Sequence, residues 1–599
     1  MDAKLIFVLL LALVGCGAQA RQGPADTAPN GAAPLSGSAL GSMPDLIRRY
    51  QSDESYVSRF FRVPWSEARL ARMGRFYEEW RGVLDGLPYD SLSATDRIDY
   101  HLLKTQIEWQ ISDLSLQRSR LAEMAVLMPF VSDVQELELA RRRMEPCDPE
   151  PAAALLDSVA EQVKKIRKRV EEGRKKEEER PEDAIVLSAV VAQRAAGALE
   201  ELAGVIDAWS GFYEGFVPDF GWWTRRPREA AQKELRDLAK YLREDVAGLK
   251  GKDEDPLVGD PIGSEALLAD MRGEMLACTP QELIAIGERE LAWCEEQMKL
   301  AAAGMGMGDD WKAALAKVKA AHVPPGGQAT LVRDEGRAAV KFLKDRNLIT
   351  IPQLCEESWR VEMHSVETQR TLPFAVYGGQ YMGVSYAAES MGHADKLMAM
   401  RGNNRHFTHI VTPHELIPGH HLQGFFADRE RPYRRIFSTP FLVEGWALYW
   451  EFRFWDLGWA GASGQDPAMD RVGMLFWRMH RAARIIVSLK FHLGEMAPQE
   501  MIDFLVDRVG HERSGATAEV RRYIGGGYSP LYQCGYMIGG IQLRELHQEL
   551  VETGKMTDRE FNDAVLRENS VPIEMIRAAL NGEALAEDWS PQWRFSDER

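Results

Sequence analysis

The sequence predicts a mainly α-helical protein built as one large multi-helix body. Three observations support this: apolar residues recur at helical spacing, helix-start signals precede several apolar segments, and one long charged stretch consists of strong helix formers. The 599 residues, 45% hydrophobic and 27% charged, have an ordinary globular composition with ample apolar residues for a large core. Because no internal repeat occurs, we expect a single helical body with lobes.

The clearest helical segments lie in the first half of the chain. Ile98, Leu102 and Ile107 approximate one apolar stripe. A long charged helix is expected at 151–179, before Pro181, with 184–210 as the returning arm of a helical hairpin. Further helices are expected at 228–249, 264–277 and 280–303, the last beginning with the capping sequence Thr279-Pro280-Gln281-Glu282.

The segment 346–387 changes character, and we expect a small β-sheet there. Three short stretches favour strands over helices, namely 346–352, 358–363 and 374–377. After Thr412 the chain returns to helices until a polar tail at 590–599. The helical domain is therefore expected to span 44–589, with the small sheet just before the histidine-rich region.

The N-terminus is typical of an exported bacterial lipoprotein. Lys4 precedes an apolar run, Leu5 to Val14, which is too short to span a bilayer. The run ends in Leu13-Val14-Gly15-Cys16, which resembles a lipobox, although an ordinary signal peptide cut near Ala18-Gln19-Ala20 is the alternative. We expect a lipoprotein signal peptide over 1–16, a flexible linker over 17–43, and a membrane anchor through Cys16 in the periplasm or outer membrane.

Charge and cysteine content exclude two classes of protein. The formal net charge of −17 repels phosphate backbones, so we expect no nucleic-acid partner. The five cysteines after Cys16 are widely spaced and form no C-x-x-C pair, so no disulfide framework is expected. The sequence does not specify an oligomeric state.

The candidate chemistry lies in a histidine cluster, with six of the 13 histidines between His393 and His421. His414-Glu415, followed within two turns by His420 and His421, resembles the His-Glu-x-x-His pattern of zinc peptidases. Neutral imidazoles hold Zn²⁺ without filling all of its coordination positions. A Glu beside the first ligand can take a proton from water that the metal acidifies. The motif therefore predicts a zinc site with Glu415 as general base.

The spacing of the motif differs from the standard one, because Pro418 occupies the usual position of the second His. On a regular helix His421 is nearly in phase with His414 but lies roughly 10 Å along the axis, and His420 is turned by about 240°. Pro418 and Gly419 favour a break in the helix. We expect this break to bring His420, rather than His421, to the metal.

A third ligand is expected from Glu444 in Glu444-Gly445-Trp446-Ala447, which follows His420 by 24 residues. This Glu-x-x-Ala pattern on a second helix matches the third-ligand arrangement of gluzincin peptidases. Glu444 stands among large apolar residues, where a carboxylate needs a partner. Gly445 and Ala447 are small, and we expect them to let the two ligand-bearing helices approach closely.

These motifs resemble the bacterial domain-of-unknown-function 885 family, which is grouped with the zincin-like metallopeptidases. The similarity covers about 45–582 and includes Thr279–Leu283, Pro530–Gly539 and Phe561–Leu566. It implies His414, His420 and Glu444 as ligands and Glu415 as base. It also implies a zincin-like helical body, for which we expect a deep cleft by analogy with other helical zincins.

The expected activity is zinc-dependent hydrolysis of peptide bonds, with oligopeptides as the favoured substrates. Tyr536 is our candidate donor to the oxyanion, with Tyr528 as its rival, and Arg544 is a candidate for binding a substrate carboxylate. One alternative is a zinc hydrolase of cell-wall peptide amides. Another is a non-catalytic, peptide-binding surface lipoprotein, against which the presence of Glu415 argues.

Overall fold

The computed structural model describes residues 41–252, 254–372 and 374–595. It is mainly helical, with 69% helix and 2% strand, which confirms the predicted mainly α class but not the expected zincin-like body. The expected signal peptide, the lipobox at Cys16 and most of the expected linker lie outside the described residues. Within the part of the chain that is described, no helix is both long and apolar enough to cross a membrane.

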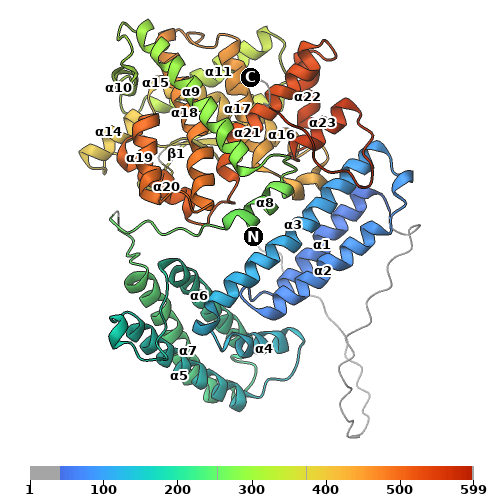
Figure 1. Ribbon diagram of the computed structural model, residues 1–599, viewed down its shortest axis with the longest axis vertical. Coiled ribbons are helices and arrows are strands. Elements are labelled where there is room, and N and C mark those ends of the chain that lie inside the picture. Colours follow the sequence, from blue (N-terminus) through green and yellow to red (C-terminus); the bar gives the residue numbers. More distant parts are fainter. Residues whose placement is uncertain (1–40, 253, 373, 596–599) are drawn as a thin grey trace, which may run out of the picture.

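The chain begins with a three-helix bundle, drawn in blue in Figure 1. It consists of α1 (Met43–Phe60), α2 (Glu67–Asp85) and α3 (Ala94–Met124). Its core is aromatic: Tyr50 packs against Phe76 and edge-on against Trp80, with ring centroids 5.6 and 5.4 Å apart. The long α3 extends from the main body to a second group of helices, so the bundle joins the two.

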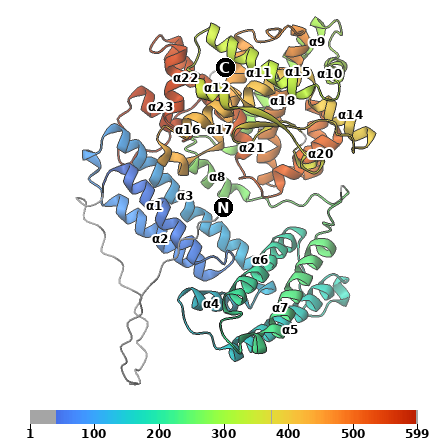
Figure 2. The ribbon, with the colours of Figure 1, turned by 180° about the vertical axis from the view of Figure 1, so that it is seen from behind.

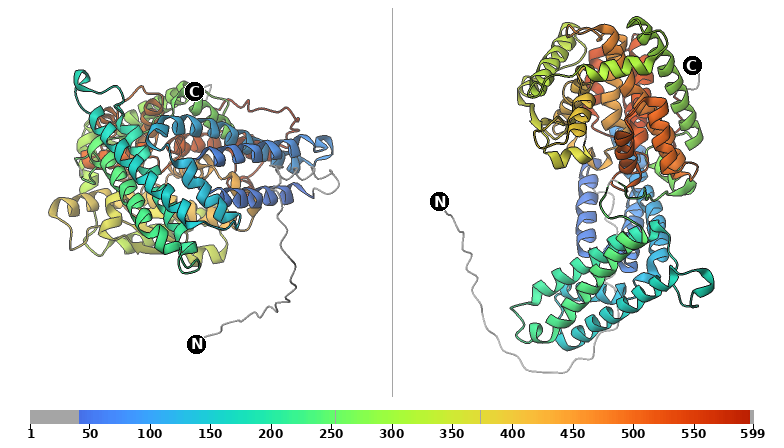
Figure 3. Two further views of the ribbon diagram at one scale, coloured as in Figure 1. Left: turned by 90° about the horizontal axis from the view of Figure 1, so that it is seen from below. Right: turned by 90° about the vertical axis from the view of Figure 1, so that its left-hand side faces the viewer.

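That second group is a lobe with a hydrophobic core of its own. It comprises α4 (Val131–Arg142), α5 (Pro149–Gly173), α6 (Ala189–Tyr213) and α7 (Phe220–Tyr241). Both predicted arms are helical, but α5 ends at Gly173, before the expected 179, and α6 begins at Ala189, after the expected 184. Each of them has α7 as its main packing partner, so the two arms do not pack together as the predicted hairpin. Figure 3 shows the lobe on the far side of the bundle from the body.

The body holds the rest of the helices around a second, larger core. At its centre, α18 packs against α9, α15 and α21, and α17 lies along α21. Its elements are α8 (Gly263–Gly273), α9 (Pro280–Gly304), α10 (Trp311–Ala320), α11 (Gln328–Asp345), α12 (Gln353–Ser358), α13 (Val366–Thr371), α14 (His393–Gly402), α15 (Arg405–Glu415), α16 (His420–Ala427), η6 (Pro432–Phe437), α17 (Pro440–Asp456), α18 (Pro467–His492), α19 (Pro498–Phe504), α20 (Arg513–Ile524), α21 (Tyr532–His547), α22 (Asp558–Arg567) and α23 (Ile573–Asn581).

A three-stranded sheet lies in the predicted region, in the order β1-β3-β2. Its strands are β1 (Arg360–Met363), β2 (Val376–Tyr377) and β3 (Tyr381–Val384), with β3 parallel to β1 and antiparallel to β2. The strand predicted at 346–352 is wrong. There α11 ends at Asp345, Asn347 adopts a left-handed φ of 52°, and the Leu348 amide donates back to the Leu343 carbonyl at 3.2 Å.

The C-terminal segment differs from the polar tail that the sequence suggested. Trp593 packs against the body core and Phe595 is buried in it. The Arg577 guanidinium lies 5.3 Å from the Trp593 ring centroid. The last described residues therefore pack against α23 and the body core.

Candidate metal centre

The histidine motif lies on two short helices separated by a break. α15 ends at Glu415 and α16 begins at His420, with a cis Ile417–Pro418 peptide and Gly419 between them. A Cβ atom on Gly419 would lie 1.7 Å from the backbone oxygen of His414, so only glycine fits this turn. The Trp446 indole of α17 donates to the Pro418 carbonyl at 2.8 Å and holds the break against the next helix.

The break brings His414 and His420 together with Glu444 from α17. One ligand atom from each of the three lies within 4.8 Å of the others. Oε2 of Glu444 lies 3.2 Å from Nε2 of His420 and 3.8 Å from Nε2 of His414. The two imidazole rings are perpendicular, with centroids 4.9 Å apart. Figure 2 shows the three helices α15, α16 and α17 gathered in the body.

His421 does not join this cluster. Its Nε2 lies 2.8 Å from the Cys355 carbonyl of α12, and the Tyr377 hydroxyl of β2 contacts its Nδ1 at 3.2 Å. Burial lowers the pKa of His421. The ring faces the small sheet and α12, as expected for a histidine that packs against a neighbouring element.

The remaining histidines of α15 are packing residues with their own acidic partners. His406 Nδ1 lies 2.7 Å from Asp470, and His409 Nδ1 lies 2.8 Å from Glu335. The His409 ring also stacks on Trp459, with centroids 4.6 Å apart. Both side chains fix α15 within the core.

The charges of the cluster stabilise one another. Burial and Arg481 oppose protonation of His414, but its hydrogen bonds to Glu444 and Glu451 raise its pKa to about 9. Burial also disfavours the ionised Glu444, yet the nearby histidines hold its pKa well below the usual range. The Glu415 side chain is buried, and burial is the main reason that the pKa of its carboxyl is raised.

Glu451 and Arg481 form an outer layer that sequence reasoning did not identify. Glu451 lies two turns after Glu444 on α17, and its Oε1 is 2.7 Å from Nδ1 of His414. Arg481 of α18 pairs with the same Glu451 oxygen at 2.8 Å and reaches Nδ1 of His414 at 3.2 Å. The sequence signal that could have identified Glu451 is its seven-residue spacing from Glu444, which places both carboxylates on one face of α17.

The helix α21 supplies two tyrosines next to the cluster. The Tyr532 hydroxyl donates to Oε1 of Glu444, a contact that was not foreseen. Tyr536, one turn later, lies nearly parallel to the His414 ring with centroids 6.4 Å apart, and burial raises its pKa to about 12. Tyr528 packs against Tyr532 with ring centroids 4.5 Å apart, so it reaches the Glu444 side of the site through Tyr532.

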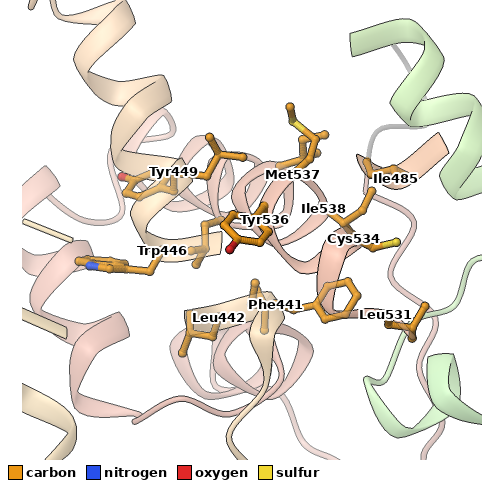
Figure 4. Close-up of a cluster of buried hydrophobic side chains, with 14 of the residues drawn as sticks. Phe441, Leu442, Trp446, Tyr449, Ile485, Leu531, Cys534, Tyr536, Met537 and Ile538 are labelled. Atoms are coloured by element: carbon orange, nitrogen blue, oxygen red, sulfur yellow. The ribbon is translucent and has the colours of Figure 1, made fainter. Parts of the chain in front are cut away.

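Backbone contact between α17 and α21 fixes these positions. A Cβ on Gly539 would lie 1.8 Å from the Phe441 carbonyl, and one on Gly445 would lie 2.6 Å from Gly539. The expectation that Gly445 lets the two ligand-bearing helices approach is therefore corrected: its close neighbour is α21. Buried hydrophobic side chains of both helices cluster in this region, among them Phe441, Trp446 and Tyr536 (Figure 4).

Two expectations about substrate binding are not supported by the geometry. Arg544 lies 3.6 Å from Glu290 and stands over the Phe452 ring, so its side chain is already engaged. The expected deep cleft at the cluster is not confirmed. A pocket of about 1020 Å³ is lined instead by α11, α12 and β1, including Arg337 and Trp359, and by none of the cluster residues.

The fold and the cluster together define a class, a helical protein with a buried His-His-Glu group on consecutive helices. The chain belongs to the family of bacterial proteins of unknown function designated DUF885, whose family model matches residues 62–580. This match confirms the family that the motifs indicated. Among curated proteins, none matches the chain.

Two solved structures are similar to this chain over about nine tenths of its length. One is a candidate lipoprotein of unknown function from Shewanella oneidensis, with a TM-score of 0.64 and 17% identity over 90% of this chain and 100% of that one. The other is a candidate lipoprotein from Colwellia psychrerythraea, with a TM-score of 0.55 and 17% identity over 91% of this chain and 99% of that one. At this identity the two establish a shared fold.

Proposed function

We propose that this protein is a zinc-dependent hydrolase that cleaves peptide bonds in oligopeptides. One observation carries the proposal: His414, His420 and Glu444 converge within 4.8 Å, and Glu415, the neighbour of the first, is buried beside them. Binding sites that only hold a metal have no need of a further carboxylate at this position. Hydrolysis needs one as a base.

The donor set suits zinc. Two imidazoles and one carboxylate are the protein ligands of a catalytic zinc site, which keeps one coordination position open. Glu451 meets the Nδ1 side of His414, and such a carboxylate partner orients a ligating imidazole and raises its basicity. A zinc ion bound there would polarise the substrate carbonyl and acidify a water molecule.

The protein's own groups would then move the protons. Glu415 directly follows His414 in the chain and is buried, and the positive charges of His414 and His420 act to lower the pKa of its carboxyl. We assign it the role of general base, which takes a proton from the attacking water and passes it to the leaving amine. The Tyr536 hydroxyl is assigned to donate to the oxyanion, since its ring lies beside His414 while Tyr532 is engaged with Glu444.

Peptide cleavage is tested with zinc-loaded protein and a peptide mixture that includes cell-wall peptides, analysed by mass spectrometry. Wild type should cleave peptides, and a chelator should stop the reaction. Glu415→Gln should abolish cleavage while its zinc content stays at the wild-type level. Cleavage by this variant, or loss of zinc from it, would contradict the assignment of Glu415.

We also propose that the protein is held at the cell envelope through Cys16. The Leu-Val-Gly-Cys sequence supports this, as does the likeness to two solved candidate lipoproteins. Cys16→Ser should move the protein from the membrane fraction to the soluble fraction, as measured by fractionation and immunoblotting. A variant that stays with the washed membranes would rule out acylation as the anchor.

A further inference from the structure

Exposed aromatic side chains concentrate at one end of the α4–α7 lobe. Among the described residues, three Phe or Trp side chains are exposed to solvent, and all three lie between residues 212 and 222. They are Phe212, Phe216 and Trp222, with exposed fractions of 44%, 84% and 78%. We call these three residues the aromatic tip. Single exposed apolar residues are ordinary, but such a group marks an interaction surface.

The fold brings the aromatic tip together. Phe212 lies in the last turn of α6, Trp222 lies in the first turn of α7, and Phe216 stands in the short turn that joins them. Met144, which is 79% exposed, follows α4 and is a neighbour of the aromatic tip. The end of α4 is close to the tip, since the Arg141 guanidinium lies 5.3 Å from the Phe212 ring centroid. The neighbouring rings Tyr213 and Phe220 are buried, so a packed base supports the exposed ones.

A short basic run, Arg225-Arg226-Pro227-Arg228, follows Trp222 in α7. Residues 212–228 contain Arg225, Arg226 and Arg228 but only two acidic residues, in a chain of net charge −17. Arg228 pairs with Glu214 at 3.0 Å. Arg225 and Arg226 are exposed at the start of α7, just after Trp222.

We infer that the aromatic tip docks on an anionic lipid surface. Trp and Phe favour the boundary between headgroups and acyl chains, and arginines beside them attract anionic headgroups. The N-terminal Leu-Val-Gly-Cys sequence and the likeness to candidate lipoproteins place such a surface within reach. For a tethered protein, weak intrinsic affinity suffices, since the tether keeps the local concentration high. The inference is independent of the proposed hydrolysis.

The test uses the chain from residue 17 onward, which lacks the acylation site and includes every described residue. Its partition is measured by sedimentation with vesicles of phosphatidylcholine alone and of phosphatidylcholine mixed with phosphatidylglycerol. Wild type should favour the anionic vesicles. The double variant Phe216→Ser/Trp222→Ser should lose about tenfold or more of its partition on them.

Two further variants separate the contributions. Arg225→Gln/Arg226→Gln should lose about tenfold on the anionic vesicles and change little on the neutral ones. Leu300→Ser/Leu354→Ser, which alters two comparably exposed apolar residues of the body, should partition as wild type does. Unchanged melting of all three variants confirms that they fold.

Three outcomes would overturn the inference. The first is that wild type does not sediment with the anionic vesicles. The second is that the aromatic variant sediments with them as well as wild type does. The third is that wild type self-associates in sedimentation velocity without vesicles, whereas the aromatic variant is monomeric there. In that last case the aromatic tip is a contact between protein copies.

Discussion

Nδ1 of His414 lies 2.7 Å from Oε1 of Glu451, while Nε2 of the same ring faces Glu444. With its proton on Nδ1, toward the Glu451 carboxylate, the ring presents Nε2 as the nitrogen that can bind a metal. Arg481 supports the arrangement, since it pairs with Glu451 at 2.8 Å.

Glu451→Gln should weaken zinc binding about 10- to 100-fold, although no ligand is removed. The neutral amide orients His414 less firmly and does not increase the basicity of its ring. Competition with a chromogenic chelator measures the change in Kd. Glu290→Gln is the matched control, because Glu290 is a half-buried partner of another arginine, Arg478, and does not touch the cluster. Equal affinities for both variants would refute a role for Glu451.

His420→Ala should lose zinc, and His421→Ala should retain it with a smaller effect on the rate. Nε2 of His420 lies 3.2 Å from Glu444, whereas His421 contacts the Cys355 carbonyl. Metal content after dialysis, determined by atomic emission, separates the two adjacent histidines. Retention of zinc by His420→Ala, together with its loss from His421→Ala, would reverse the assignment.

Gly539→Ala should destabilise the body by about 1–3 kcal/mol or more, because the added methyl group would overlap the Phe441 carbonyl. It should also weaken zinc binding, since α17 carries Glu444. Urea unfolding measures the first effect and chelator competition the second. Gly515→Ala in α20 is the control: its added methyl group meets no atom within 4 Å and should stabilise the helix slightly.

Acid should remove the contribution of His101 to stability. Its Nε2 lies 2.9 Å from the Tyr89 hydroxyl, and burial lowers its pKa to about 4. In the unfolded chain the pKa is about 6.5, so between these values the unfolded state binds more protons and stability falls as the pH falls. The loss is about 3 kcal/mol when complete.

The comparison with His101→Gln isolates this residue from other titrating groups. The difference in unfolding free energy between wild type and variant should shrink as the pH falls from about 7 to about 4. Denaturant titrations at several pH values give this difference. A difference that does not change with pH would mean that His101 has the same pKa in the folded and unfolded states.

The sequence predicted those parts of the fold that depend on local signals. Thr279 caps α9 in a capping box with Glu282, as its spacing indicated. The choice of His420 over His421 followed from the rise of a helix. The strand predicted at 346–352 is wrong because Asn347 adopts the left-handed conformation just after α11 and ends that helix, a role that the strand propensity of its neighbours does not reveal.

The outer layer of the site depends on how helices are oriented, which spacing alone does not determine. Glu451 and Tyr532 each lie at a helical spacing from a residue that was singled out, Glu444 and Tyr536. Which of the two tyrosines meets the Glu444 carboxylate depends on the rotation of α21 against α17. That rotation is set by the backbone contact at Gly539, and no sequence pattern identified the partner of this glycine.

The separate hydrophobic core of the α4–α7 lobe has a thermodynamic consequence. Two cores joined mainly through the bundle can melt as two cooperative units, so calorimetry should resolve two transitions and no single Tm describes the chain. A ligand that binds only one unit raises only that unit's transition. Zinc should therefore shift the melting of the body and leave that of the lobe in place, which would let a thermogram report on metal loading without any enzyme assay.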